Sequence, residues 1–463
     1  MRSAKGRMWN SMPRTSARFA ILARDNRQMR AKGENAMRTM ELLAPAGGRE
    51  QLEYAIHFGA DAVYLATERY GMRKRADNFT ESDLPDAIAY AHAHGARVHV
   101  TVNTVMTDAD VDDLPRYFRF LEQAGADAVI VSDLGAISIA RSVAPKLEIH
   151  LSTQASCENA ASARAYYDLG VRRIVVAREM SLDAIAELRR RIPDDLEIEA
   201  FVHGAMCMAY SGRCLISDYL TGRGANVGHC TQPCRWKYAL VEETRPGEYF
   251  PVVEDDRGSF IMSSHDMNML AHLDELAAAG VNSVKIEGRA KGAYYVASVV
   301  NAYRHVLDGE PADAWEAELE TTSHRPWCTG FYFGQPGQNK GSVEYARAYQ
   351  MVACVEESGA VLCRNRFAVG DTVEVLSPGQ PVRTFDIGGI VWHAKPEADL
   401  AEVQKKGTGV VLGSDPACVG GHLVRVQVAN RTMESYSIEA PFPLRPRDIL
   451  RAYRPEQDLG RTL

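Results

Sequence analysis

The chain has 463 residues, of which 46% are hydrophobic and 24% charged, so it can bury a substantial core, and global disorder is excluded. No apolar run approaches the roughly 18–20 residues that a membrane span needs, and the N-terminus lacks the apolar region of a secretory signal. Nine cysteines without an export signal predict a cytoplasmic protein whose thiols are free or bound to a metal.

The charge of the chain is unevenly distributed. Residues 1–40 carry ten Lys or Arg and two acidic residues, which leaves 43 basic and 58 acidic residues in the rest, a formal charge near −15. The first segment can be a disordered basic arm that contacts nucleic acid. It can also be an extension upstream of the true start, at Met37 or Met40. We favour this second interpretation because the segment is not amphipathic.

From residue 41 onward, helix-like segments that end at a glycine alternate with short apolar segments, as in "FGADAVYLA" at 58 and "AGADAVIVS" at 124. Glycine readily adopts the left-handed conformation that ends a helix. Eight such units predict an α/β fold, a TIM-like barrel over residues 41–310. The expected strands are 41–45, 62–66, 97–103, 128–132, 148–153, 173–177, 197–202 and 283–287. A doubly wound sheet is the alternative, but "APAGGRE" is not a dinucleotide-binding fingerprint.

Four later stretches depart from the βα pattern. Residues 207–234 form a four-cysteine insertion in the seventh unit, and residues 249–264 are expected to form a hairpin. Residues 311–345 are expected to be a linker and packing surface. Period-two alternation with Gly and Pro turns then predicts a small all-β domain, a barrel or sandwich, over residues 346–450.

Strand parity predicts an unusually polar barrel interior, because alternate side chains of a barrel strand point toward the axis. The expected inward set is His99, Thr101, Asn103, His150, Ser152, Gln154, Glu197, Glu199, Phe201, His203, Lys285, Glu287 and Arg289. The deeper members can form a structural network, for example an ion pair between Lys285 and Glu199. Barrel enzymes carry their chemistry at the C-terminal strand ends. The candidate site is therefore Asn103, Gln154, His203, Glu287 and Arg289.

A basic cluster follows the second strand, on the same face of the barrel as the candidate site. It consists of Arg69, Arg73, Lys74 and Arg75. Such a cluster is either a solvated loop or a binding site for a carboxylate or phosphate, which arginine contacts in a bidentate manner. The sequence leaves both interpretations open.

Four of the nine cysteines lie in one window after the seventh strand. Cys207, Cys214, Cys230 and Cys234 are separated by six, fifteen and three residues. Thiolates suit zinc or an iron–sulfur cluster, and structural zinc normally uses closely spaced pairs, a condition that only the last two cysteines meet. The wide spacing favours a 4Fe–4S cluster, with zinc and free thiols as the alternatives.

The stretch that contains the first two of these cysteines resembles a known signature. Residues 199–217, "EAFVHGAMCMAYSGRCLIS", are similar to the signature of the collagenase-like peptidase family. The segments "ELLAPAG" at 41 and "SVKIEGR" at 283 also resemble that family, and the similarity spans about residues 40–450. The length and the added β domain most resemble its branch of tRNA hydroxylation proteins.

This resemblance implies a TIM-like barrel and a 4Fe–4S cluster on Cys207, Cys214, Cys230 and Cys234. It also implies 5-hydroxylation of uridine at position 34 of tRNA, with prephenate as the associated metabolite. Because the body of the chain is acidic, tRNA contact has to be local. The expected substrate-binding residues are Arg73, Arg75, Asn103, Gln154 and Arg289. The expected catalytic residues are Glu287 and His203.

Two other functions remain open at this point. A peptidase needs an activated nucleophile or a metal with an open position, and the chain has neither an H-E-x-x-H nor a G-x-S-x-G motif. A cluster-bearing partner of another enzyme is the third possibility. The oligomeric state is not predicted.

Overall fold

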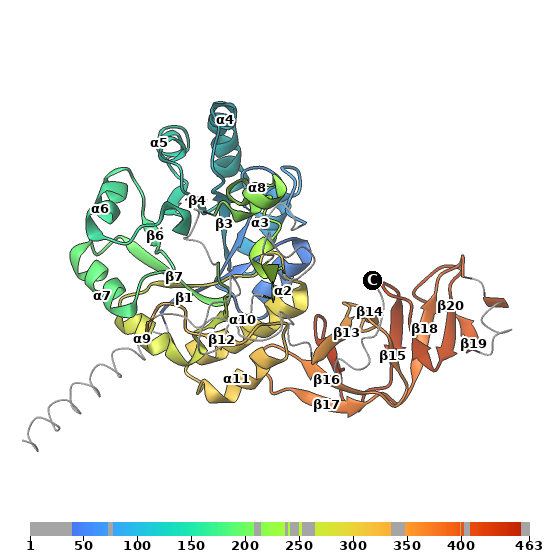
Figure 1. The fold of residues 1–463 in the computed structure, drawn as a ribbon. Helices are drawn as coiled ribbons and strands as arrows, with labels where there is room; N and C mark the ends of the chain where they lie inside the picture. Colours follow the sequence, from blue (N-terminus) through green and yellow to red (C-terminus); the bar gives the residue numbers. More distant parts are fainter. Residues whose placement is uncertain are drawn as a thin grey trace, which may run out of the picture.

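A computed structural model describes residues 39–72, 77–207, 214–236, 239–240, 250–251, 264–334, 348–398, 400–401 and 408–454. Figure 1 shows a barrel with helices on its outside and an all-β domain beside it. Arg73, Lys74 and Arg75 of the basic cluster lie outside the described residues, as do most of the expected hairpin at 249–264 and nearly all of residues 1–40. None of the helices in the described part of the chain is long and apolar enough to cross a membrane.

Eight parallel strands close the barrel, which confirms the predicted fold. Each strand pairs with the next in chain order, and the last pairs with both the first and the seventh. The strands are β1 (Glu41–Pro45), β2 (Ala62–Leu65), β3 (Arg97–Val102), β4 (Ala128–Val131), β5 (Glu148–Leu151), β6 (Arg173–Val175), β7 (Glu197–Ala205) and β11 (Ser283–Ile286). All eight overlap the strands expected from the sequence.

Helices between the strands cover the outside of the barrel (Figure 1). They are α2 (Arg49–His57), α3 (Leu84–Ala93), α4 (Asp108–Ala124), α5 (Leu134–Val143), α6 (Ala160–Asp168), α7 (Leu182–Arg191), α9 (Leu273–Ala278) and α10 (Ala293–Leu307). Local signals set their ends. Helix α4 begins at a capping box between Thr107 and Asp110 and ends at Gly125, whose φ is 88°.

The two faces of the barrel strands differ in chemistry, as parity predicted. Val98, Val100 and Val102 of β3 are fully buried in the core between the sheet and the helices. Inside the barrel, the apolar cluster is small and consists of Leu43, Ala62, Tyr64 and Ile130. The rest of the interior is polar, because His99, Thr101, His150, Glu199 and Lys285 are buried there.

A short edge extends the sheet beyond β7. Strand β10 (Asp266–Asn268) runs antiparallel to β7, and β12 (Trp327–Cys328) runs parallel to β10. The buried carboxylate of Asp266 accepts two hydrogen bonds from the Arg325 guanidinium, at 2.7 and 3.0 Å, which fixes this edge. The segment 311–345 therefore contains more structure than a linker, since α11 (Asp313–Glu320) and β12 both belong to it.

The C-terminal domain is built from antiparallel sheets. Nine strands form the main sheet: β13 (Tyr349–Val355), β14 (Val361–Cys363), β16 (Thr372–Leu376), β17 (Arg383–Asp386), β18 (Ile390–Ala394), β19 (Gly409–Ser414), β20 (His422–Val426), β22 (Ser435–Ile438) and β23 (Ile449–Tyr453). Strands β15 (Phe367–Ala368) and β21 (Val428–Ala429) form a second pair. A buried ion pair of 2.6 Å between Arg451 and Glu318 connects the domain to α11, which follows the barrel.

Candidate active site at the mouth of the barrel

A cavity of about 120 Å³ lies at the C-terminal ends of the barrel strands. We call it the mouth cavity. It brings together five residues that the sequence singled out, from three different strand ends and the cysteine segment: Asn103, Gln154, Cys207, Glu287 and Arg289. Its remaining lining residues are Tyr64, Met72, Thr101, Ile130, Ser152, Thr153, Val175, Arg178, Phe201 and Lys285.

Arg178 is a component of this site that sequence reasoning missed. Its guanidinium lies over the ring of Phe201, 3.9 Å from the centroid, and one terminal nitrogen lies 3.3 Å from Glu287 Oε2. The other donates to the carbonyl oxygen of Ala205 at 3.2 Å. The signal that could have found it is its position, directly after the apolar strand 173–177 at the C-terminal end of the barrel.

Two more cations line the mouth cavity. Arg289 is 3% exposed and donates to the Thr101 hydroxyl at 2.7 Å and to the amide oxygen of Asn78 at 3.2 Å. Lys285 is 4% exposed, and its ammonium lies 4.3 Å from the centroid of the Tyr64 ring. Since Glu287 is the one carboxylate among the cavity's lining residues, the cavity favours an anionic ligand.

His203 does not lie in the mouth cavity, although parity placed it on the inside of the barrel. It contacts residues on the outer side of β7, with its Nδ1 3.4 Å from the Tyr303 hydroxyl and its ring 5.0 Å from that of Trp327. The physical reason is a register shift: Phe201 pairs with Lys285 but His203 pairs with Ile286, so β7 holds one extra residue there. A single extra residue reverses which side the following side chains face.

Beneath the mouth cavity lies a network of buried charges. Lys285 Nζ is 2.7 Å from Glu199 Oε1, as the sequence suggested, and Arg173 is 3.2 Å from Glu199 Oε2 and 2.5 Å from Glu41. Burial alone would raise the pKa of Glu41, but Arg173, His99 and Arg97 together lower that pKa to about 2. The sequence did not predict that Arg173 and Glu41 belong to this buried network, because each is the first residue of its strand.

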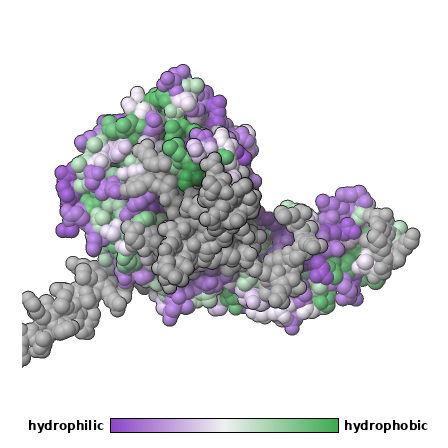
Figure 2. Space-filling model, in the orientation of Figure 1, coloured by the Kyte–Doolittle hydropathy of each residue, from purple (hydrophilic) through white to green (hydrophobic). Residues whose placement is uncertain are grey.

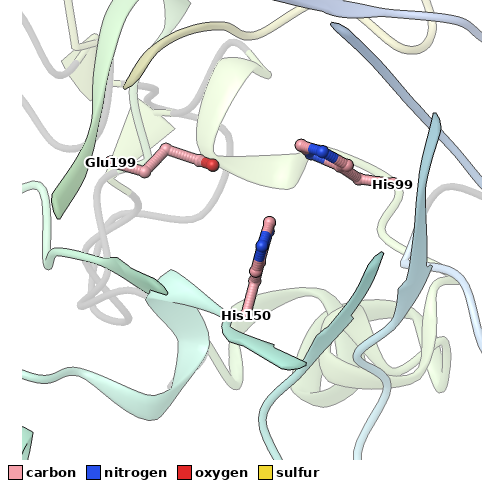
Figure 3. A group of neighbouring side chains, drawn as sticks. All are labelled: His99, His150 and Glu199. Carbon is pink, nitrogen blue, oxygen red and sulfur yellow. The ribbon is translucent and has the colours of Figure 1, made fainter. Parts of the chain in front are cut away.

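Three side chains of the interior resemble a metal-ligand group. Ligand atoms of His99, His150 and Glu199 lie within 4.8 Å of one another, and their side chains point toward a common space (Figure 3). However, Lys285 and Arg173 already bind the two oxygens of Glu199, and two adjacent cations repel a third. Burial, followed by the nearby Arg173, lowers the pKa of His150 to about 3, so its ring is neutral. We assign these residues to the charge network.

The cysteine segment lies beside the mouth cavity. Cys207 lines the cavity, while Cys214, Cys230 and Cys234 lie in a compact unit with helix α8 (Ile216–Thr221) and the short 3₁₀ helices η2 (Ala225–Val227) and η3 (Pro233–Arg235). The Asn226 amide donates to the carbonyl of Cys214 at 3.1 Å. The Asn226 carbonyl accepts from the N–H of Val105 at 3.0 Å, which ties the unit to the end of β3.

No disulfide joins any of the nine cysteines, all of which lie within the described residues. The four cysteines of the segment differ in burial, since Cys207 is exposed and Cys214, Cys230 and Cys234 are partly buried. A 4Fe–4S cluster and zinc both stay predictions for them.

Exposed apolar side chains gather on the same segment. Tyr219 is 90% exposed and Trp236 is 47% exposed, and both are close in sequence to the cysteines. We call these two residues, together with Leu215, Leu220 and Val227, the aromatic rim. Figure 2 shows hydrophobic surface beside polar surface at the end of the barrel where Figure 1 places α8. Large exposed apolar and aromatic residues gathered in one segment are typical of a binding surface.

The fold and the site define a TIM-like barrel protein with a cationic cavity and a cysteine-bearing segment at its mouth. Residues 47–342 match peptidase family U32, and the chain belongs to this family. It is 39% identical to "tRNA hydroxylation protein P1" of Bacillus subtilis, over 73% of this chain and 83% of the relative. It is 37% identical to "tRNA hydroxylation protein P" of Escherichia coli, over 73% and 86%. A 5-hydroxycytidine synthase of Escherichia coli 23S rRNA is 37% identical, over 62% and 42%.

Proposed function

We propose that this protein is an RNA-modifying enzyme that hydroxylates a base of tRNA, namely uridine 34 at carbon 5. Prephenate is the small-molecule substrate and a 4Fe–4S cluster is the cofactor. The observation that carries the proposal is the cationic mouth cavity directly beside Cys207. It lies in a chain whose relatives, over 73% of its length, are named tRNA hydroxylation proteins.

The four cysteines of the segment fit the proposed cluster. Thiolates are the ligands that iron–sulfur clusters use, and the segment can supply four of them from Cys207, which lines the cavity, and from Cys214, Cys230 and Cys234. When bound, such a cluster supplies one-electron chemistry next to the substrate. The protein's own part is to bind, orient and shield the reacting groups.

The mouth cavity supports binding of a small dicarboxylate. Arg289 is held in place by Thr101 and Asn78, so its guanidinium can contact one carboxylate without losing much side-chain entropy. Arg178 is held by Glu287 and by the Phe201 ring and can contact the other carboxylate. Asn103 and Gln154 add amide groups to the same wall. Arg73 and Arg75 stay predicted contributors, and Glu287 is the group that can accept or donate a proton in the cavity.

The aromatic rim supports contact with a single-stranded RNA loop. Bases of RNA loops are unstacked and bind by stacking on aromatic side chains. Tyr219 and Trp236 present such surfaces on the cysteine segment, where a stacked base can precede the base that enters the cavity. Stacking does not depend on net positive charge, which suits the acidic body of this protein.

Peptidase activity is the second candidate, because the family carries that description. The lining of the mouth cavity does not favour it. Its aliphatic hydroxyl side chains are Thr101, Ser152 and Thr153, and its lining residues include no histidine. The Ser152 hydroxyl lies 3.3 Å from the amide oxygen of Gln154, which is no base for activating a nucleophile. The third candidate is a cluster-bearing partner of another enzyme.

One experiment tests the proposal and separates the three candidates. The protein is purified anaerobically, analysed for iron, sulfide and zinc, and incubated with prephenate and tRNA that lacks the modification. We expect about four iron and four sulfide per chain, and a uridine heavier by one oxygen atom in nucleoside mass spectrometry. Cys230→Ser should lose the iron and the activity, whereas Cys363→Ser, which changes a buried cysteine of the β domain, should keep both.

Three results would count against the proposal. Stoichiometric zinc without sulfide would contradict the cluster. Cleavage of gelatin by the parent protein, lost in Cys230→Ser and without any tRNA product, would favour the peptidase. Hydroxylation that requires a second protein would favour the partner role.

A further inference from the structure

The outer face of the C-terminal domain holds a serine, a histidine and an aspartate in one hydrogen-bonded chain. His393 Nδ1 lies 2.9 Å from Asp415 Oδ2, and His393 Nε2 lies 2.8 Å from the Ser437 hydroxyl. The aspartate side chain is 2% exposed and the histidine side chain 21%, while the serine is exposed. Burial therefore increases from the serine to the aspartate, as it does in enzymes that use such a triad.

Antiparallel pairing brings these residues together. Strand β18 lies between β20 and β22, and Val391 of β18 pairs with both Ser437 and Arg425. Trp392 is buried in the core of the domain, so its neighbours Val391 and His393 face outward. His393 is two residues beyond Val391, which places it diagonally opposite Ser437 on the same face.

The aspartate is held in position by its own turn. Asp415 follows β19, and its Oδ1 accepts from the N–H of Ala417 at 2.8 Å. Its main-chain N–H donates to the carbonyl of Gly421 at 2.9 Å, and its carbonyl accepts from Cys418 at 3.2 Å. A carboxylate fixed in this way requires a proton on Nδ1 of His393. Nε2 is then an acceptor for the proton of the Ser437 hydroxyl.

We propose that this triad is a second active site, one that hydrolyses carboxylic esters through Ser437. The hydroxyl oxygen attacks the ester carbonyl carbon while its proton passes to His393. The bond to the alkoxy group then breaks, and the alcohol leaves with that proton. Water next attacks the acyl-serine, gives a proton to His393, and releases the carboxylic acid as the serine regains its proton.

The same face supplies two further elements of such a site. Arg425 of β20 and Ser437 of β22 both pair with Val391 of β18, so the main chains of the two residues are about 9–10 Å apart. An arginine side chain can cross this distance and reach the negative charge on the attacked carbonyl oxygen. Val410, which is 64% exposed, pairs with Arg425 and offers an apolar surface for a short acyl chain. The match to the U32 family ends at residue 342, so this site lies outside the matched region.

Labelling of the full-length protein with a fluorophosphonate probe tests the proposal. The probe forms a covalent bond to an activated serine with loss of fluoride, and peptide mass spectrometry locates the label. We expect the label on Ser437, its absence in Ser437→Ala, and labelling slower by about 100-fold in His393→Gln. Hydrolysis of p-nitrophenyl acetate should decrease in the same order, and Arg425→Ala should slow it while leaving the thermal unfolding unchanged.

Ser435→Ala is the matched control, because Ser435 lies two residues earlier in β22 on the same face. It should label like the parent. At the aspartate, Asp415→Asn is preferred to Asp415→Gln, because the longer glutamine side chain can unfold the turn. Circular dichroism checks that each variant is folded. Labelling at another residue, no labelling, or labelling that is unchanged in a folded His393→Gln variant would overturn the proposal and leave the triad as a structural hydrogen-bond chain.

Discussion

Lys285 of β11 and Glu199 of β7 form an ion pair of 2.7 Å inside the barrel, directly beneath the mouth cavity. Glu199 is fully buried, and Lys285 is both a member of this pair and part of the cavity floor. The charge of the cavity floor therefore depends on the network beneath it. The Lys285–Glu199 ion pair therefore affects both the stability of the barrel and the ligand preference of the mouth cavity.

Replacing Lys285 by methionine should destabilise the protein. The variant leaves the buried carboxylate of Glu199 with one cation instead of two, and breaking a buried pair costs about 3–5 kcal/mol. Urea unfolding measures this loss as a decrease in the free energy of unfolding. The control is Arg190→Met, which breaks an exposed pair with Glu187 and should cost less than about 1 kcal/mol. Equal losses in the two variants would contradict the role of the buried network.

The buried His203 should make the protein less stable in mild acid. Burial lowers its pKa from 6.5 to about 3, so the unfolded chain binds this proton at a higher pH than the folded protein does. The stability that depends on neutral His203 is complete above about pH 6.5 and is lost as the pH falls toward 3, with about 2 kcal/mol lost at pH 5. The difference in unfolding free energy between pH 8 and pH 5 should be smaller by that amount in His203→Gln. An unchanged difference would show that folding does not lower the pKa of His203.

The arginines of the mouth cavity should determine binding of prephenate. Arg178→Ala and Arg289→Ala each remove a charge-assisted contact and should weaken binding by about 2–3 kcal/mol. Calorimetry on the cluster-loaded protein measures the affinity, and both variants should keep the absorption spectrum of the cluster. Arg172→Ala is the control, because Arg172 precedes β6 at the opposite end of the barrel, where it packs on Tyr167. If the two cavity variants bind as the parent does, the ligand lies elsewhere.

Tyr219 should contribute to RNA affinity by stacking. Tyr219→Ala should weaken binding of an anticodon stem-loop by about 1–3 kcal/mol, while Tyr219→Phe keeps the ring and should bind like the parent. Fluorescence titration gives the affinities, with a duplex of the same sequence as a ligand that offers no unstacked bases. The control is Phe333→Ala, since Phe333 is also exposed, at 52%, but lies outside the aromatic rim, against His272. A loss in Tyr219→Phe equal to that in Tyr219→Ala would contradict stacking.

Local sequence signals predicted the barrel and most of its inner face. Glycine-ended helices and apolar strands are local signals, so the eight strands follow from residues that are neighbours in the chain. Parity also identified Asn103, Gln154, Glu287 and Arg289 as residues of one end of the barrel, and the pair of Lys285 with Glu199 beneath them. Alternation along a strand is a local property, which is why these predictions succeeded.

Features that depend on strand register or on distant segments became visible in the folded chain alone. His203 was misplaced because one extra residue in β7 reverses its side, and a bulge depends on the neighbouring strand rather than on the strand's own sequence. Arg178 meets Glu287 across 109 positions of the chain. His393, Asp415 and Ser437 are joined by the pairing of β18 with β20 and β22 and by the turn after β19. Such contacts depend on how strands align in space, which the pattern of single residues does not encode.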